Sequence, residues 1–200
     1  ADDPEHQDLS ETFARGSMLS SMLLPEVAAN ICIETLHLEK DAIFHEIDRI
    51  STLGKFEIFV KLSFRNRVIN RGISAVEGYQ EIKRLRDSFV HPKRLKTNWE
   101  RTDDGLLENF ENLTCVPENT AHLKVQKAPM HWVADDARIV MRGAHKFLKY
   151  MFKDVCKFSA KRTTSLLFSE ELVPDKSQAI YPVYDREVKE LLADWGVDLS

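Results

Sequence analysis

Apolar residues recur at close to the 3.6-residue period of an α-helix between Ser17 and Ile50, and no other feature constrains the fold as strongly. The period predicts a long, largely buried helix. We expect this helix to begin near Pro25, because proline fits the first turn of a helix better than its middle, and to break near Lys40. The apolar segment KFEIFVKL, which follows Gly54, predicts a second and shorter helix.

A third helix is expected from Ser74, whose hydroxyl can form a capping box with Glu77 three residues later. Pro92 disfavours helical geometry at the residue before it, so this helix should end at or just before His91. Its apolar residues lie three or four positions apart and predict one buried stripe, made of Val76, Tyr79, Ile82, Leu85 and Phe89.

A fourth helix is expected to begin at Asp135 or Asp136 and to run to about Phe158, with one apolar side. Between the third and fourth helices, residues 93–130 contain a glycine, two prolines and many polar residues. This composition predicts an irregular insert, with a short helix or a hairpin as the alternatives for its structured part.

The segment DREVKELLADW, residues 185–195, predicts a last short helix. Together the patterns predict an all-α, antiparallel helical bundle. In this interpretation residues 1–19 are an N-terminal arm, residues 20–160 form the bundle with its insert, and residues 161–200 are a C-terminal extension.

Charge and hydropathy exclude several functions. The net charge of −4 argues against a protein that coats nucleic acid over its whole surface. Residues 142–162 nevertheless carry seven basic residues against Asp154 alone, which leaves room for a local anion-binding surface. No apolar run approaches the roughly 18 residues of a membrane span, and the acidic start ADDPEHQDLS does not resemble a signal peptide. We therefore expect no contact with a membrane.

The cysteines also indicate a cellular compartment. Cys32, Cys115 and Cys156 form neither a CxxC pair nor the spacing of a zinc-ligand set. They predict reduced thiols and a cytoplasmic protein. The sequence shows no phosphate-binding glycine loop and no nucleophile elbow, so we expect neither a metal nor another cofactor.

The segment KRLRDSFVHPKR, residues 83–94, holds the candidate catalytic residues. In a regular helix Arg86 and His91 point about 140° apart, while Arg84 lies within about 20° of the direction of His91. Because Pro92 removes the need for helical geometry at His91, these three side chains can converge on a site just beyond the end of the helix.

Such a group suits cleavage of a phosphodiester. A histidine that titrates near neutrality can take a proton from a hydroxyl or return one to a leaving oxygen. An arginine can hold a phosphate by bidentate hydrogen bonds, and RNA supplies its own nucleophile, the 2′-hydroxyl, so no metal is required. Two structural alternatives stay open. His91 can cap the last carbonyls of its helix, and Arg84 and Arg86 can form a solvated face that pairs with Glu81 and Asp87.

This order of segments resembles the HEPN family (higher eukaryotes and prokaryotes nucleotide-binding domains). The resemblance rests on ANICIETLHL in the first helix, on KFEIFVKL in the second, and on YQEIKRLRDSFVHPK around the motif. The family motif is an Arg-Asn or Arg-Asp pair, an apolar spacer and His-Pro, which Arg86, Asp87, His91 and Pro92 match. Glu34 is similar to a glutamate that often faces the motif. The resemblance covers roughly residues 20–158.

The resemblance implies a bundle of four or five helices. It also implies a metal-independent endoribonuclease in which two chains meet on a two-fold axis and form one composite site. Cleavage by the 2′-hydroxyl would leave a 2′,3′-cyclic phosphate, in a toxin, defence or stress-response system with an antitoxin or a regulatory protein as a further partner. Other members of the family are non-catalytic binding or dimerisation modules for a partner protein or a nucleotide, so this alternative remains.

On this basis each residue of the motif receives a role. We expect His91 to act as general acid and base, Arg86 to hold the phosphate, and Asp87 to orient one of them. Arg84 would make a secondary anion contact, and Glu34 would support the site.

A stripe of basic residues is the candidate RNA-binding surface. Arg142, Lys146, Lys149 and Lys153 are spaced four, three and four residues apart on the helix that follows the insert. The stripe predicts a surface that follows a phosphate backbone and brings RNA to His91. Its structural alternative is the solvated side of an amphipathic helix.

Overall fold

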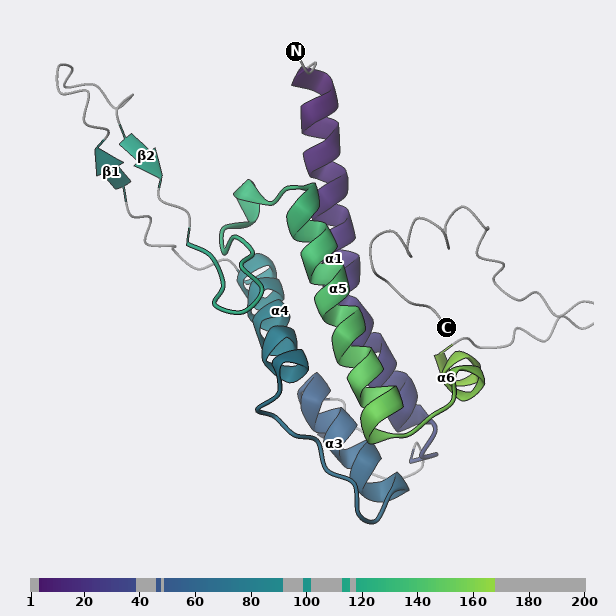
Figure 1. Ribbon diagram of the computed structural model, residues 1–200. Helices are drawn as coiled ribbons and strands as arrows, with labels where there is room; N and C mark the ends of the chain where they lie inside the picture. The colour runs from purple at the N-terminus through teal and green to yellow at the C-terminus, as the bar shows by residue number, and fades with distance from the viewer. Residues whose placement is uncertain are drawn as a thin grey trace, which may run out of the picture.

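The computed structural model describes residues 4–38, 46–47, 49–91, 99–101, 113–115 and 118–167 (Figure 1). Over these residues the protein is mostly helical, which confirms the all-α class. The elements in chain order are α1 (Pro4–Glu34), α3 (Thr52–Ser63), α4 (Ser74–Val90), β1 (Trp99–Arg101), β2 (Leu113–Cys115), the 3-10 helix η2 (Pro129–His131), α5 (Ala134–Lys149), the π-helix η3 (Tyr150–Val155) and α6 (Ala160–Leu167).

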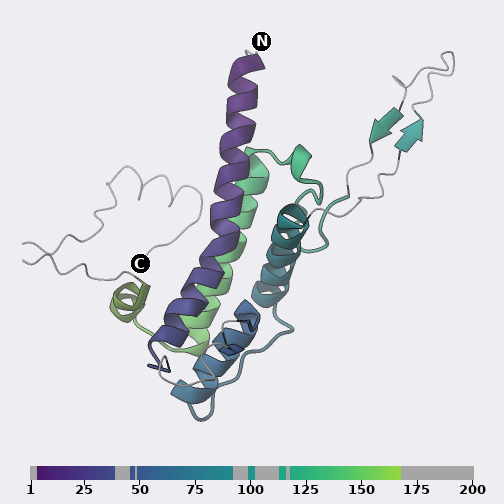
Figure 2. The ribbon, with the colours of Figure 1, turned by 180° about the vertical axis from the view of Figure 1, so that it is seen from behind.

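The helices α1 and α5 lie side by side and run in the same direction, while α4 runs antiparallel to both (Figure 1 and Figure 2). Packing agrees with these directions. Met18, in the first half of α1, packs in one cluster with Val140 near the start of α5. Cys32, near the end of α1, packs in a second cluster with Cys156, which follows η3. The predicted antiparallel arrangement is therefore correct for α4 and wrong for α1 relative to α5.

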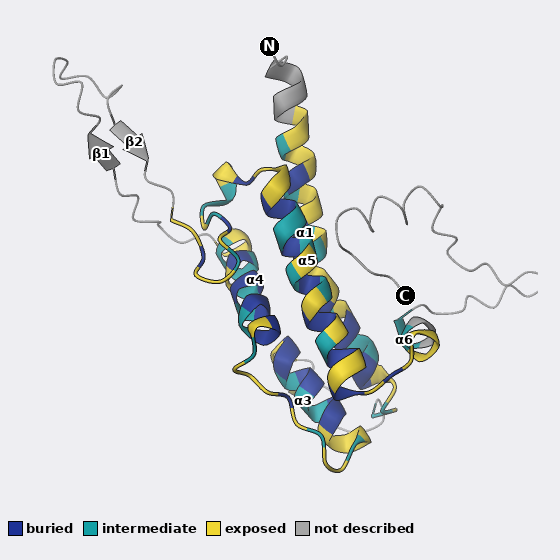
Figure 3. Cartoon of the chain, in the orientation of Figure 1, coloured by how far each residue is buried: buried dark blue, intermediate teal, exposed yellow. Residues whose placement is uncertain are grey.

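The buried apolar side chains form two clusters, one toward each end of the helices (Figure 3). The cluster around α3 is aromatic. Phe56 contacts Phe147 and Phe152 edge-on, with ring centroids 5.6 and 6.1 Å apart, and Tyr79 stacks on Phe147 at 4.2 Å. The other cluster packs Met18 and Met22 of α1 and Ile82 and Leu85 of α4 against the alanines and valine of α5. These contacts fix α4 against α1 and α5.

Helix α1 begins far upstream of the predicted start. It spans Pro4–Glu34 and contains Pro25 in its interior, so the expectation that Pro25 lies in the first turn is wrong. Ala14 and Met18 are buried against the bundle, and residues 9–19, expected in an arm, belong to this helix. Proline removes one backbone hydrogen bond from a helix. Pro25 is nevertheless fully buried, and tertiary packing on both sides of it stabilises the continuous helix.

The same helix is also longer and more apolar than the sequence analysis assumed. From Leu9 to Glu34 it has the length and mean hydropathy of a helix that could cross a membrane, although 39% of the window is buried inside the protein. The core helix of a soluble protein and a signal sequence meet the same criterion, so this is weak evidence. The expectation that no segment approaches the length of a membrane span is therefore wrong for Leu9–Glu34.

Helix α4 ends where Pro92 predicts. Val90 is its last residue, and His91 is the C-cap. Its start differs from the prediction, because the N-cap is Ile73 and no side chain caps the helix. The hydroxyl of Ser74 instead accepts a hydrogen bond from Lys146 Nζ of α5 at 3.0 Å. Of the predicted stripe, Val76, Tyr79, Ile82 and Leu85 are buried, whereas Phe89 is 37% exposed.

Helix α5 continues into η3, so helical structure runs from Ala134 to Val155, close to the predicted extent. The last turns are wider than an α-helix, and the Cys156 N–H donates to the Met151 carbonyl five residues earlier at 2.9 Å.

The described part of the insert contains a small antiparallel sheet. In it β1 pairs with β2, and Trp99 lies opposite Cys115. The first residues of the predicted extension, 161–167, belong to helix α6. The helix predicted at residues 185–195 lies outside the described residues.

Candidate functional site

The candidate catalytic residues lie on the last turns of α4 and at its C-terminal end. The side chains of Arg86 and Asp87 are 22% and 39% exposed, and Arg84 and His91 are exposed. Helical geometry continues to Val90, and His91 leaves it with φ −122° and ψ 71°.

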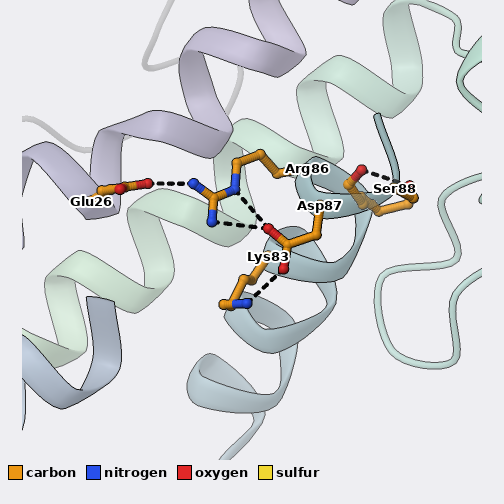
Figure 4. A network of polar contacts seen from close by, with 6 residues as sticks. Glu26, Lys83, Arg86, Asp87 and Ser88 are labelled. Atoms are coloured by element: carbon orange, nitrogen blue, oxygen red, sulfur yellow. Dashed lines mark hydrogen bonds and ion pairs between the residues drawn. The ribbon is translucent and has the colours of Figure 1, made fainter. Parts of the chain in front are cut away.

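Carboxylates from two helices hold Arg86 (Figure 4). Its Nη1 donates to Oε2 of Glu26, on α1, at 2.5 Å. Its Nε and Nη2 lie 3.1 and 2.9 Å from Oδ1 of Asp87. Hydrogen bonds between charged groups are short and strong, so the guanidinium is fixed between α1 and α4.

Asp87 also binds a second cation. Its Oδ2 accepts a hydrogen bond from Lys83 Nζ at 2.6 Å. Burial is the largest single influence and acts to raise the pKa of Asp87, but the hydrogen bonds and charges of Lys83 and Arg86 together lower that pKa. Glu26, Lys83, Arg86 and Asp87 form what we call the Arg86 network, in which two cations balance two carboxylates. A phosphate that approaches Arg86 therefore meets two carboxylates as well.

Arg86 keeps part of its hydrogen-bonding capacity. A guanidinium has five N–H donors, and the contacts above use one donor on each of its three nitrogens. Among the contacts of the described residues, two donors are therefore left for another acceptor, and Figure 4 shows the partners that take the others.

The predicted convergence of the motif is not seen within one chain. Across the described contacts, no hydrogen bond or ion pair joins His91 to Arg86. The two residues are five positions apart on a helix that is regular to Val90, which separates their Cα atoms by about 7.5 Å along the axis. In this structure Arg86 and His91 are therefore not joined directly into one site.

Glu26, and not Glu34, is the glutamate that faces the motif. Glu34 is the last residue of α1 and is exposed, eight residues and about 12 Å along the helix from Glu26. The sequence holds a signal for Glu26, because it is the single charged residue between Arg15 and Glu34. A lone charge on a helix that packs against a neighbour is expected to find a partner there.

Glu81 has a structural role that the sequence analysis missed. The alternative of a solvated face has Glu81 pairing with Arg84 or Arg86. In the structure Glu81 pairs with neither. Its side chain is 4% exposed, and its carboxylate accepts the backbone N–H of His122, at 2.9 and 3.1 Å, and of Leu123, at 2.8 Å. Burial acts to raise the pKa of Glu81 and is the largest single influence, but these hydrogen bonds together lower that pKa.

Glu81 thus ties residues 118–132 to α4. Within this segment Trp132 is fully buried, and its Nε1 donates to the Gln126 carbonyl at 2.7 Å. Its ring stacks on that of Phe89, with the ring centroids 5.7 Å apart. Phe89 is two residues before His91 in the sequence. The segment supports the end of α4, and Trp132 is a packing residue.

The basic stripe is exposed along its length. Arg142, Lys146 and Lys149 lie on α5, and Lys153 lies on η3. Lys146 contacts Ser74 at the first turn of α4, whereas His91 lies at the other end of that helix, about 25 Å away along its axis. At about 3.4 Å per stacked nucleotide, one strand of roughly seven nucleotides would be needed to contact both.

In the described ranges, no group of three or more histidine, cysteine, aspartate or glutamate side chains is placed to bind a metal ion. In comparisons with known proteins, no family model, curated protein or solved structure matches this chain. The likeness to HEPN domains therefore rests on the sequence motif and on the helical class.

Proposed function

We propose that the protein is a metal-independent endoribonuclease that cleaves RNA through the 2′-hydroxyl of its substrate. One observation supports this most. A guanidinium that two carboxylates hold in place has two N–H donors that no described residue uses, on the same helix end as an exposed histidine. A fixed arginine and a solvent-accessible imidazole are the two groups that such a reaction requires.

In this proposal His91 takes the proton from the 2′-hydroxyl or returns one to the 5′ leaving oxygen. Arg86 donates its two remaining N–H groups to the non-bridging phosphate oxygens, and Asp87 and Glu26 keep the guanidinium oriented. Arg84, exposed on the same helix, adds positive charge near the substrate. Because no described hydrogen bond or ion pair joins His91 to Arg86 within one chain, we propose that a second copy completes the site.

The stripe of Arg142, Lys146, Lys149 and Lys153 would bind the RNA backbone away from the cleavage site. We place the enzyme in the cytoplasm, where the buried thiols of Cys32 and Cys156 stay reduced. A toxin, defence or stress-response system, with an antitoxin or regulatory protein, is the setting we propose.

The test is cleavage of a single-stranded RNA in EDTA by the parent protein, His91→Ala and Arg86→Lys. We expect the parent to produce 2′,3′-cyclic phosphate ends. His91→Ala should lose about 10²–10⁴-fold in rate, and Arg86→Lys should lose activity because lysine lacks the bidentate fork. His131→Ala, at another exposed histidine, is the matched control and should cleave like the parent. Equal activity in all four proteins would refute the proposal.

A second function is supported by the charge balance of the Arg86 network. Because Glu26 and Asp87 already neutralise Arg86 and Lys83, the motif can serve as a link between α1 and α4 in a non-catalytic module that binds a protein or a nucleotide. If the protein is such a module, the parent should not cleave RNA. Arg86→Lys should then have a lower melting temperature and should, like the parent, leave RNA uncleaved.

A further inference from the structure

The outer face of α1 carries a regular apolar seam. Its positions are spaced four, three, four, three and four residues apart, the repeat of a coiled-coil seam, and they are Leu9, Phe13, Gly16, Ser20, Leu23 and Val27. These six positions fall within an arc of about 80° on a helical wheel. Leu9, Phe13, Leu23 and Val27 are 53%, 66%, 45% and 52% exposed. In Figure 2, α1 lies at the outside of the bundle, in front of α5.

No charge interrupts the seam. The charged residues of α1 between Leu9 and Ile33 are Glu11, Arg15 and Glu26, and all three lie about 100° or more from the centre of the seam. Arg15 pairs with Glu11 at 3.0 Å, and Glu26 pairs with Arg86. A helix face without charges, exposed over about 27 Å, is unusual for a surface that only contacts water.

The middle of the seam is built for close approach. A Cβ added to Gly16 would meet nothing within 4 Å. The hydroxyl of Ser20 donates to the Gly16 carbonyl at 3.1 Å, so burial would leave it with a hydrogen-bond partner. Small residues in the middle, with large apolar residues on both sides, allow a second helix to cross at this point.

The order of side chains along the seam points to its occupant. The seam residues form pairs that lie the same number of positions before and after Met18 in the sequence. The pairs are Leu9 and Val27, Phe13 and Leu23, and Gly16 and Ser20. In an antiparallel pair of identical helices with its two-fold axis at the level of Met18, large residues face large residues and Gly16 faces Ser20 of the other copy. We propose that two copies of this chain associate through the α1 seam in this antiparallel register.

The charges disfavour the other occupants. A membrane surface attracts amphipathic helices that carry lysine and arginine beside the apolar face, whereas the one basic residue of the helix is engaged by Glu11. The segment before the seam, ADDPEHQD, is acidic and would be repelled by anionic lipids. A seam with the coiled-coil repeat fits one helix better than it fits a flat bilayer.

The proposed dimer does not depend on ribonuclease activity. It places the contact on α1, whereas a composite site made of Arg86 and His91 from two chains would place it at the end of α4. Glu26, which binds α4, precedes the seam residue Val27 by one position and so lies about 100° around the helix. A two-fold axis perpendicular to two antiparallel α1 helices would therefore keep both α4 helices on one side of the dimer.

The first test is the oligomeric state of the full chain by sedimentation velocity over a range of concentrations. We expect a dimer, and we expect Phe13→Glu to raise its dissociation constant at least about 100-fold, since two charges would be buried in each dimer. Val68→Glu is the matched control, because Val68 is 82% exposed and lies outside α1, and it should leave the dimer intact. A monomeric parent, or a dimer that Phe13→Glu leaves unchanged, would overturn the proposal.

The second test determines the register by disulfide cross-linking in a Cys115→Ser background. Gly16→Cys mixed with Ser20→Cys, and Leu9→Cys mixed with Val27→Cys, should give cross-linked heterodimers. Leu9→Cys alone should not, because the two copies of residue 9 lie about 27 Å apart in the antiparallel pair. Efficient cross-linking of Leu9→Cys to itself would show a parallel pair and overturn the register.

Two further outcomes assign the seam to another occupant. A parent chain that dimerises only after removal of residues 168–200 would show that its own C-terminal segment covers the seam. A parent that binds anionic vesicles, with binding abolished by Phe13→Glu, would show a membrane surface. Either result overturns the proposed dimer of the full chain.

Discussion

The bond between Glu81 and the 118–132 segment gives the most quantitative prediction. Glu81→Gln keeps the shape of the side chain but removes its charge, and it points an amide donor at one of the two backbone N–H groups of His122 and Leu123. A hydrogen bond to a charged group contributes about 1.5–3 kcal/mol, and a neutral one about 1 kcal/mol. Because Glu81 is 4% exposed, solvent screening reduces these values little.

Replacing two charged hydrogen bonds by one neutral bond should therefore lower the free energy of unfolding by about 2–5 kcal/mol at pH 7. For a chain of this length that corresponds to a fall in Tm of roughly 4–20 °C, measurable by circular dichroism. Glu118→Gln is the control. Glu118 is 65% exposed and pairs with Lys127 at the surface, so its Tm should barely change.

The difference between the parent and Glu81→Gln should also depend on pH. The pKa of Glu81 is lowered from its ordinary value of 4.5, so the folded state holds this proton less tightly than the unfolded state. The stability contribution is therefore fully present above pH 4.5 and is lost as the pH falls through the lowered pKa. Equal Tm values at pH 7, or a difference that grows as the pH falls below 4.5, would refute the reasoning.

Three more predictions follow from the described contacts. A double-mutant cycle of Glu26→Gln and Arg86→Met, measured by urea unfolding, should give a coupling free energy of about 1 kcal/mol. The value is small because Glu26 is 38% exposed and water screens the pair. A coupling free energy of zero would contradict an ion pair that links α1 to α4. Phe56→Ala should lower the free energy of unfolding by about 3–5 kcal/mol, since its fully buried ring contacts two others, and a loss below about 1 kcal/mol would be inconsistent with that packing. Burial raises the pKa of Cys32 to about 12 and of Cys156 to about 11, so both thiols should react with a disulfide reagent at pH 8 only in urea; labelling of the native protein at the unfolded rate would show that they are accessible.

If the protein cleaves RNA, the Arg86 network has to position its arginine without consuming it. Glu26 and Asp87 restrict the guanidinium to one orientation, and their negative charge opposes a phosphate at the remaining donors. Glu26→Gln separates these effects. A rise in RNA affinity would mean that the carboxylate charge opposes binding, while a fall would mean that orientation matters more.

Several elements could be predicted from the sequence because their causes are local. Proline at position 92 ends α4 at Val90 by restricting the residue before it. The spacing of Val76, Tyr79, Ile82 and Leu85 identified a buried stripe, because a helix buries residues three or four positions apart. Arg86, Asp87 and His91 were found by residue type alone, and their chemical roles remain proposals.

Other features depend on contacts between distant segments, and no local pattern specifies these. Pro25 signals a helix start, yet it lies inside α1, because packing against α5 outweighs the loss of one backbone hydrogen bond. The choice of Glu26 over Glu34 as the partner of Arg86 depends on the height at which α4 packs against α1. The burial of Glu81 requires the N–H groups of His122 and Leu123, more than forty residues away. Local sterics and periodicity in the sequence therefore indicated the helices α3, α4 and α5 and the end of α4, but not the start of α1. The tertiary structure decided the direction of the helices and the partner of each charge, because a side chain's partner depends on which helices meet and in what register.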